Sequence, residues 1–255
     1  MILKKTRNKK IVRMKKRGNR VAKIGGFLLL VVVTLLVLML TPFFNIDWID
    51  IKGNEKVSRG EIKSAISYNQ GDNIFKLNLH RGEQNLTKIP YVETAKVKRK
   101  LPDGIRVAIT ERIPVAYLDE NGIIILIDKD GRLLEQTDKA PENIPCLKGA
   151  IIEGLVLGQL IEDKSEESAK AFTVIYEKLN EYGLYDRVSE LDITKTDAIE
   201  FSFDKNKRVV VGDGYRIDYK LMMLQAAIDE LAPSEAGTIR LTVEGKAIFA
   251  PDKQE

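Results

Sequence analysis

The sequence is poor in the side chains that carry most enzyme chemistry. Its 255 residues include one histidine, His80, and one cysteine, Cys146. A single histidine leaves no strong candidate for a Ser-His-Asp triad or for a metal site built from several histidines. A single cysteine cannot form an internal disulfide, so the folded part must depend on the packing of its core. We interpret Cys146 as a small buried hydrophobic residue rather than a nucleophile.

Three short patterns resemble functional motifs, but each lacks the context that its motif needs. The stretch from Ser202 to Lys205 has the Ser-x-x-Lys spacing of penicillin-interacting enzymes, yet it crosses a predicted strand and turn, without a Lys-Thr-Gly partner. The Asp128–Gly131 stretch lacks the distal glutamate of an EF-hand and predicts a hairpin turn. Residues 212–214 lack the third glycine of a dinucleotide loop. We expect no catalytic residue, metal or cofactor, although scattered carboxylates could still meet in space.

Acidic residues are absent from the first 23 positions, which hold eleven Lys and Arg. The uncharged residues 24–40 follow, with Thr34 as their only polar side chain. Seventeen helical residues span ~26 Å, and extension of the helix through Phe44 reaches the ~30 Å of a bilayer core. We therefore predict one transmembrane helix at residues 24–44. The basic tail, residues 1–23, would contact lipid and stay in the cytoplasm, and the rest of the chain would lie outside.

Two alternatives for this N-terminal region are disfavoured. A cleaved signal peptide usually has a shorter apolar region, and residues 41–45 offer no small-x-small cleavage site. Nucleic-acid binding requires a basic face, but the chain after the tail holds 30 Lys and Arg against 37 Asp and Glu. This mildly acidic balance is typical of a soluble extracytoplasmic module on a membrane tether.

Hydrophobic periodicity predicts the order strand, helix, helix, strand, strand directly after the membrane segment. Ser58 and Glu61 have the spacing of a capping box, which places a helix start between a first strand and the Gly71 loop. The predicted elements are a strand at 46–52, a helix after Ser58, a helix at 79–88 and a hairpin of strands 92–100 and 105–112.

The second half of the chain predicts more strands and two longer helices. Phe172, Ile175, Tyr176 and Leu179 form one apolar stripe, and Gly183 is placed to end that helix. The predicted helices are 165–182 and 219–231, and the predicted strands are 115–118, 123–127, 188–193, 199–203, 208–211, 238–243 and 247–249.

Several local sequences, taken in order, resemble the FtsQ/DivIB family of cell-division proteins. Residues 49–54, 57–58, 61–62 and 71–75 resemble the opening of that family's POTRA domain, and residues 97–102, 111–112 and 114–116 resemble its closing hairpin. The resemblance covers nearly the whole chain and implies an α+β fold class. It implies a single transmembrane helix, a POTRA domain at 45–113, a mixed α/β C-terminal β domain at 114–251, and a polar tail at 252–255.

This resemblance implies a non-enzymatic scaffold of the divisome, at the septal cell membrane. Such a protein binds bitopic FtsB/DivIC-like and FtsL-like partners and acts indirectly on the septal peptidoglycan synthase complex. Carried onto this chain, the partner-binding residues would be Val243, Glu244, Gly245, Lys246, Ala247, Ile248 and Phe249. Val243 and Phe249 would be apolar anchors, and Lys246 a charge contact.

Other interpretations of the same residues stay open. Ile248 and Phe249 could equally close the core of the β domain. Residues 46–54 could form a recruitment surface or a membrane-proximal spacer, of which the spacer is the more cautious choice. The alternative functions are an extracytoplasmic POTRA-bearing chaperone or secretion component and, less favoured, a cell-wall enzyme.

Overall fold

The computed structural model describes residues 23–150, 155–161, 166–242, 244 and 246–252. These residues form two compact units. The first unit takes its residues from 1–52, 59–83 and 96–108, and the second from 53–58, 84–95 and 109–255. The predicted division into a POTRA domain at 45–113 and a β domain at 114–251 stays a prediction. The basic tail other than Lys23, and residues 253–255, lie outside the described residues.

An apolar helix covers residues 23–39, and its large hydrophobic side chains are exposed. No helix among the described residues is long and apolar enough to cross a membrane. The predicted extension of the helix through Phe44 is wrong, because Thr41 is extended (φ −72°, ψ 156°) and a separate 3-10 turn, η1 (Pro42–Phe44), follows. Proline explains this break, since it lacks an N–H and disfavours helical geometry at the preceding residue.

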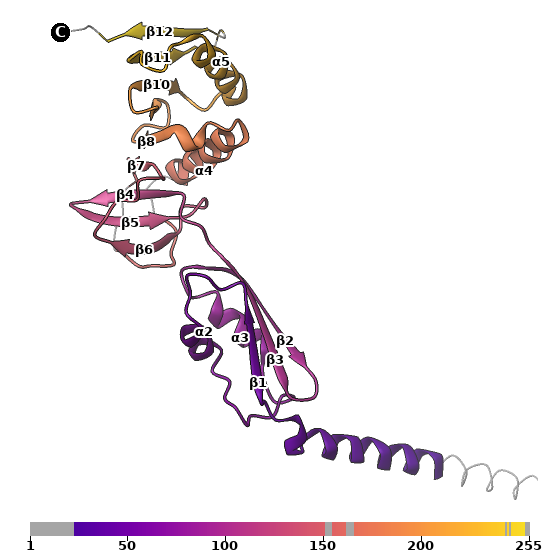
Figure 1. The fold of residues 1–255 in the computed structure, drawn as a ribbon. Coiled ribbons are helices and arrows are strands. Elements are labelled where there is room, and N and C mark those ends of the chain that lie inside the picture. Colours follow the sequence, from indigo (N-terminus) through magenta and orange to yellow (C-terminus); the bar gives the residue numbers. More distant parts are fainter. Residues whose placement is uncertain (1–22, 151–154, 162–165, 243, 245, 253–255) are drawn as a thin grey trace, which may run out of the picture. The chain divides into compact units, whose positions relative to one another are not determined.

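A three-stranded sheet with two short helices follows (Figure 1). Its strand order is β1-β3-β2, with β1 parallel to β3. Along the chain the elements follow the order strand, helix, helix, strand, strand, as the sequence predicted; the strand order within the sheet was not predicted. The elements are β1 (Trp48–Lys52), α2 (Arg59–Ile66), α3 (Leu79–Leu86), β2 (Val92–Lys100) and β3 (Gly104–Glu111).

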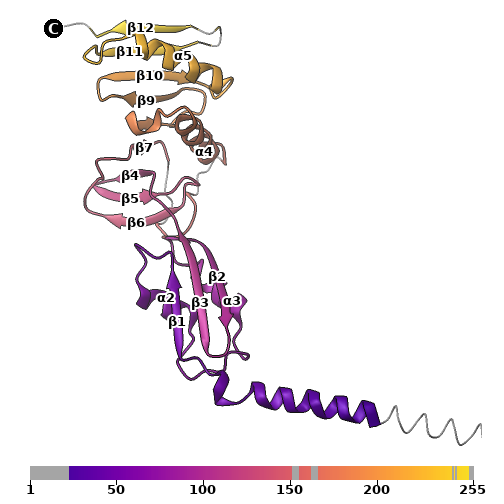
Figure 2. The ribbon, with the colours of Figure 1, turned by 45° about the vertical axis from the view of Figure 1, so that its right-hand side comes forward.

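A nine-stranded sheet dominates the second unit (Figures 1 and 2). Its strand order is β12-β11-β10-β9-β8-β7-β4-β5-β6, so β12 and β6 are the two edges. The strands are β4 (Ala116–Glu120), β5 (Ile123–Ile127), β6 (Leu133–Thr137), β7 (Cys146–Lys148), β8 (Val188–Asp192), β9 (Ile199–Phe203), β10 (Lys207–Gly212), β11 (Gly237–Leu241) and β12 (Ala247–Pro251).

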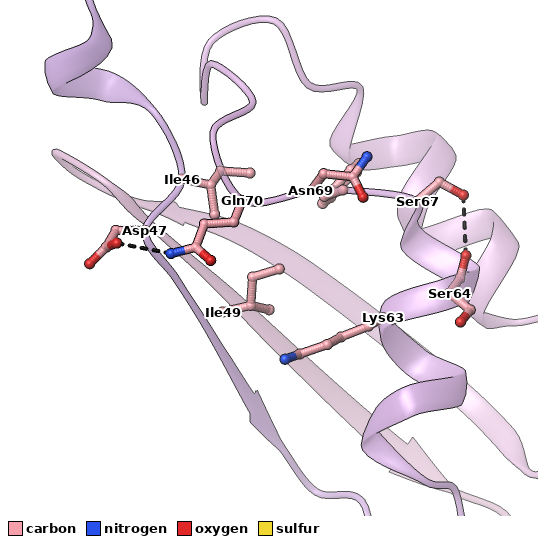
Figure 3. Close-up of a pocket in the computed structure, with 9 residues that line it drawn as sticks. Ile46, Asp47, Ile49, Lys63, Ser64, Ser67, Asn69 and Gln70 are labelled. Carbon is pink, nitrogen blue, oxygen red and sulfur yellow. Dashed lines mark hydrogen bonds between the residues drawn. The ribbon is translucent and has the colours of Figure 1, made fainter.

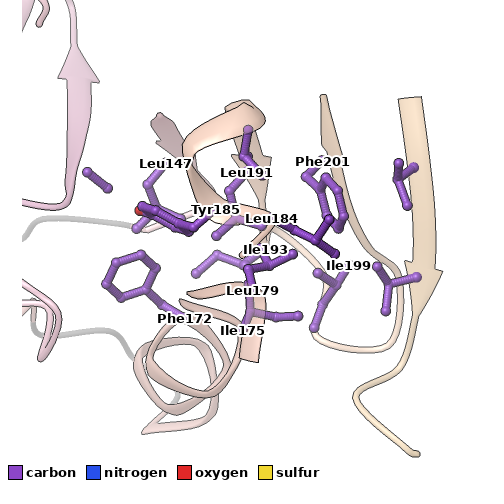
Figure 4. Close-up of a cluster of buried hydrophobic side chains, with 14 of the residues drawn as sticks. Leu147, Phe172, Ile175, Leu179, Leu184, Tyr185, Leu191, Ile193, Ile199 and Phe201 are labelled. Atoms are coloured by element: carbon purple, nitrogen blue, oxygen red, sulfur yellow. The ribbon is translucent and has the colours of Figure 1, made fainter. Parts of the chain in front are cut away.

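Two helices, α4 (Glu166–Glu181) and α5 (Ile217–Glu230), lie on the same side of this sheet (Figures 1 and 2). The α4 stripe of Phe172, Ile175 and Leu179 is at most 1% exposed and points toward the strands (Figure 4). Gly183 follows the helix with φ +65°, as predicted for its end. The main core of the second unit therefore lies between the helices and one face of the sheet, and a smaller buried cluster of Ile124, Leu126 and Leu134 lies on the opposite face at β5 and β6.

Alternation along the C-terminal strands β9, β10 and β11 separates this buried face from the opposite one. In β9, Ile199, Phe201 and Phe203 are at most 2% exposed and belong to the core, whereas Glu200 and Ser202 point the other way. The same period of two continues in β10 and β11. One face of the sheet at the C-terminal end is thus apolar and covered, and the other is polar.

Candidate functional site

The free edge of β12 has unpaired main-chain groups. The N–H of Thr242 donates to the Lys246 carbonyl (2.9 Å), and the N–H of Asp252 donates to the Ala236 carbonyl (3.1 Å). Lys246 and Asp252 therefore direct their backbone groups toward β11. Because backbone direction alternates along an antiparallel strand, Ala247 and Phe249 direct theirs away from the sheet.

Pro251 limits this edge, because proline has no N–H to offer. The outward hydrogen-bonding groups of β12 are therefore the N–H donors of Ala247 and Phe249 and the carbonyl acceptors of the same two residues. A strand edge with unpaired donors and acceptors can accept a strand from another chain through main-chain hydrogen bonds. The chemistry available at this edge is therefore β-strand addition.

The side chains of β12 divide between the two faces of the sheet. Phe249 pairs with the buried Ile239 and packs against the core, with its ring over Gly237, where a Cβ atom would collide with it. Ile248 pairs with Arg240 on the polar face and is 52% exposed. Phe249 is thus a partly buried residue that closes the core, and Ile248 is the apolar side chain that the strand presents outward.

The structure describes only part of the predicted partner-binding stretch. Val243 and Gly245 lie outside the described residues, so the anchor role predicted for Val243 stays a prediction. Glu244 lies in a turn, and Lys246 hydrogen-bonds through its backbone to Thr242. The remaining residues, Ala247, Ile248 and Phe249, form the first part of β12.

A row of side chains crosses the polar face of the sheet and ends at Ile248. The strand register aligns six residues in this row: Lys148, Asp192, Glu200, Val210, Arg240 and Ile248. Ion pairs stabilise this face, including Lys148–Glu190 (2.7 Å) and Arg208–Glu200 (2.5 Å). Both α4 and α5 lie on the opposite face. A strand added to β12 would therefore extend this row past Ile248.

The catalytic patterns in the sequence fall in unsuitable places. Ser202 lies within β9, and Lys205 follows in a turn with φ +64°, so this Ser-x-x-Lys pattern does not open a helix. A hydrogen-bonded pair with Arg187 (2.7 Å) holds the pKa of Asp204 below its usual value. Burial raises the pKa of the Cys146 thiol, which keeps it protonated and poorly nucleophilic.

Metal ligands do not gather in the part of the chain that the structure describes, where no group of three or more His, Cys, Asp and Glu side chains could hold an ion. His80 lies on α3 with its side chain 78% exposed. The Asp128–Gly131 stretch forms a turn, as predicted, and the carboxylate of Asp128 accepts the backbone N–H groups of Asp130 and Arg132. Both bonds end on Oδ1, so this oxygen has no lone pair left for a metal.

Asp128 also forms a buried ion pair that the sequence did not predict. Its carboxylate is 2% exposed and lies 2.5 Å from Nη1 of Arg112, whose side chain is 11% exposed. Asp130 adds a longer contact to the same guanidinium at 3.3 Å, and its own side chain is 48% exposed. Arg112 follows β3, so the pair ties the end of that strand to the β5–β6 turn within the second unit.

Two family matches cover most of the chain. Residues 44–112 match the POTRA domain, FtsQ-type, and residues 116–244 match the C-terminal family of cell division proteins FtsQ/DivIB. The chain belongs to the FtsQ/DivIB family. This confirms the resemblance drawn from the local sequences, and a role in cell division follows for the chain at the level of its family.

Curated FtsQ/DivIB relatives match over similar lengths. Cell division protein DivIB of Clostridium botulinum (strain Hall) is 27% identical over 253 residues, which cover 95% of this chain and 96% of the relative. DivIB of Bacillus subtilis (strain 168) is 24% identical over 240 residues, which cover 90% of this chain and 83% of the relative. The major extracytoplasmic domain of DivIB from Geobacillus stearothermophilus is 20% identical, with a TM-score of 0.31, over 48% of this chain and 98% of that domain.

Proposed function

We propose that this FtsQ/DivIB protein is a membrane-anchored scaffold that binds FtsB/DivIC-like and FtsL-like bitopic partners through the free edge of β12. The observation that carries the proposal is the row of outward main-chain groups at Ala247 and Phe249 in a protein of this family. In this proposal residues 24–44 cross the cell membrane, the N-terminus is cytoplasmic, and both folded units lie outside, at the division septum.

The bound partner strand would receive its affinity from the main chain and its specificity from side chains. It would accept or donate hydrogen bonds at Ala247 and Phe249 and place an apolar residue beside the exposed Ile248. Long side chains of the partner strand next to that residue would reach Arg240, which is exposed on the neighbouring strand β11. The surface proposed for partner binding keeps the full stretch from Val243 to Phe249.

Scaffolding would act on wall synthesis through local concentration. Two single-pass partners that are held on one protein meet each other at an effective concentration set by the tether rather than by their free diffusion in the membrane. Fixed orientation at β12 would bias the associated septal peptidoglycan synthase toward its active arrangement. In this mechanism the protein needs no catalytic residue of its own.

The proposal predicts that Ala247→Pro weakens partner binding by about ten- to a hundredfold, because an unmade hydrogen bond leaves a buried acceptor unsatisfied at about 1–3 kcal/mol. The substitution removes an outward N–H without removing a hydrogen bond to β11. Calorimetry would measure binding of the full chain, in lipid nanodiscs, to the outer segment of the FtsB/DivIC-like protein from the same organism.

Ala247→Ser is the matched control, because serine changes the side chain at the same position and keeps the N–H. We expect it to bind within about twofold of the unmodified protein, a difference of roughly 0.4 kcal/mol. Equal affinities for the proline and serine variants, with both folded by circular dichroism, would place the partner elsewhere. Phe249→Asp is a poorer test, because Phe249 packs against the core and its loss would also damage folding.

A further inference from the structure

A groove of about 510 Å³ lies in the first unit, between the start of β1 and helix α2 (Figure 3). In Figures 1 and 2, helix α2 lies on the side of β1 that faces away from β3. The lining of the groove includes Ile46, Asp47 and Ile49 from the strand side and Lys63, Ser64 and Ser67 from the helix side.

Strand β1 has hydrogen-bonding main-chain groups on two sides, and those on the side away from β3 are largely unpaired. The N–H of Asp47 donates to Asp103 (2.9 Å) on the β3 side, whereas the N–H of Ile46 donates to Asp72 (2.9 Å) on the other side. Since backbone direction alternates, Trp48 and Asp50 point to the same side as Ile46. In the described chain, β1 pairs with β3 alone, so these groups of Trp48 and Asp50 form an open edge.

A short loop already shows that this edge accepts a strand. The N–H of Gly71 donates to the Ile46 carbonyl (2.9 Å), and Asn45 and Asn73 form an antiparallel bridge. The loop therefore pairs with the chain just before β1 and then leaves. A second segment could continue the same ladder along Trp48 and Asp50.

The other edge of the three-stranded sheet, β2, is protected in two ways. The carboxylate of Glu83 accepts the N–H of Val97 (2.9 Å), which occupies a donor of the strand. Lys96, Lys98 and Lys100 are exposed along β2, and lysines on an edge discourage strand addition. Strand β1 has the sequence Trp-Ile-Asp-Ile-Lys and carries a single exposed lysine, Lys52, at its C-terminal end, beyond Trp48 and Asp50.

The groove has an apolar side chain, Ile49, a cation, Lys63, and a carboxylate, Asp47, which already accepts a hydrogen bond from the side-chain amide of Gln70 (3.2 Å). Ile49 is partly exposed and lines the strand side. Lys63 is exposed and extends from α2 toward β1 (Figure 3), and no carboxylate of the described residues forms an ion pair with it. A segment lying here would therefore be favoured by an apolar side chain against Ile49 and a carboxylate against Lys63.

We infer that this groove is a second docking surface, which binds an extended, acidic and alternately apolar segment of another protein as an added strand on β1. The main chain of the segment pairs with Trp48 and Asp50, and its carboxylate meets Lys63. This inference does not rest on the scaffold proposed above, because its residues belong to the first unit and those of β12 to the second.

The test uses the full chain in lipid nanodiscs and a phage-displayed library of short random peptides as the probe. Selected peptides should alternate apolar and polar residues and carry Asp or Glu. Lys63→Glu should weaken a selected peptide about fivefold, in line with the loss and reversal of one exposed ion pair. Lys98→Glu makes the same charge change on β2 and should leave the affinity unchanged.

Hydrogen exchange measured by NMR separates strand addition from other modes of binding. The bound peptide should slow exchange at the amides of Trp48 and Asp50, and N-methylation of alternate peptide residues should abolish binding. The inference is overturned if the library yields no binder, if Lys63→Glu and Lys98→Glu behave alike, or if binding leaves both amides unprotected.

Discussion

Replacing Asp128 with alanine is expected to lower the free energy of unfolding of the second unit by about 3–5 kcal/mol. The reason is that Arg112, 11% exposed, would keep its charge in a buried place without its main counterion. The same change removes the acceptor for the N–H groups of Asp130 and Arg132, which hold the β5–β6 turn. Breaking one partner of a buried pair is costly even where the intact pair adds little.

Asp130→Ala is the matched control for this loss. Asp130 contacts the same guanidinium at 3.3 Å, but its side chain is 48% exposed, so water screens the interaction. Its removal should cost at most about 1 kcal/mol. Chemical unfolding of the full chain in detergent micelles, followed by far-UV circular dichroism, measures both variants. Equal losses for Asp128 and Asp130 would contradict the assignment of the buried pair.

The fluorescence of Trp48 supplies an internal reference for this experiment. Trp48 is the only tryptophan of the chain and belongs to the first unit, whereas Asp128 belongs to the second. Asp128→Ala should therefore shift the circular dichroism transition and leave the fluorescence transition in place. A shift of both transitions together would show that the two units unfold as one.

Replacing Phe172 with alanine should destabilise the second unit by about 3–5 kcal/mol. Phe172 is 1% exposed on the α4 stripe (Figure 4). Its ring stacks near that of Tyr176, with 6.2 Å between ring centroids. Truncation removes buried apolar area and leaves a cavity that the surrounding strands cannot fill. The same unfolding measurement in micelles reports the loss.

Val174→Ala tests whether burial, rather than the change in helix sequence, causes this effect. Val174 lies two residues further along α4 and is 46% exposed. Alanine has a slightly higher helix propensity than valine, so the expected change is within about 0.5 kcal/mol in either direction. A loss at Val174 as large as that at Phe172 would mean that α4 buries a different face.

Local patterns in the sequence predicted most of the elements, because each element satisfies its own periodicity and end signals. From the α4 stripe and Gly183 the sequence predicted a helix at 165–182, and the observed bounds, Glu166–Glu181, differ from it by one residue at either end. Strand β7 was missed, because Cys146–Lys148 is too short for a period of two. Its place between β4 and β8 depends on pairing with residues some way along the chain, such as Leu191.

The candidate site shows where local sequence stops being informative. Ile248 and Phe249 are adjacent and both apolar, and either could be the exposed anchor. Their roles depend on which face of β12 is covered by α5, and that is a property of the whole second unit. The Arg112–Asp128 pair was missed for the same reason, since only the fold brings the end of β3 to the β5–β6 turn.

Hydrogen exchange at the amides of Ala247 and Phe249 tests the central claim most directly. The full chain in lipid nanodiscs would be compared by NMR with and without the outer segment of its FtsB/DivIC-like partner. Strand addition at β12 predicts that both amides, which point away from β11, exchange at least about tenfold more slowly in the complex, as expected for donors that become hydrogen-bonded. Unchanged exchange at both amides in a saturated complex would contradict the proposal.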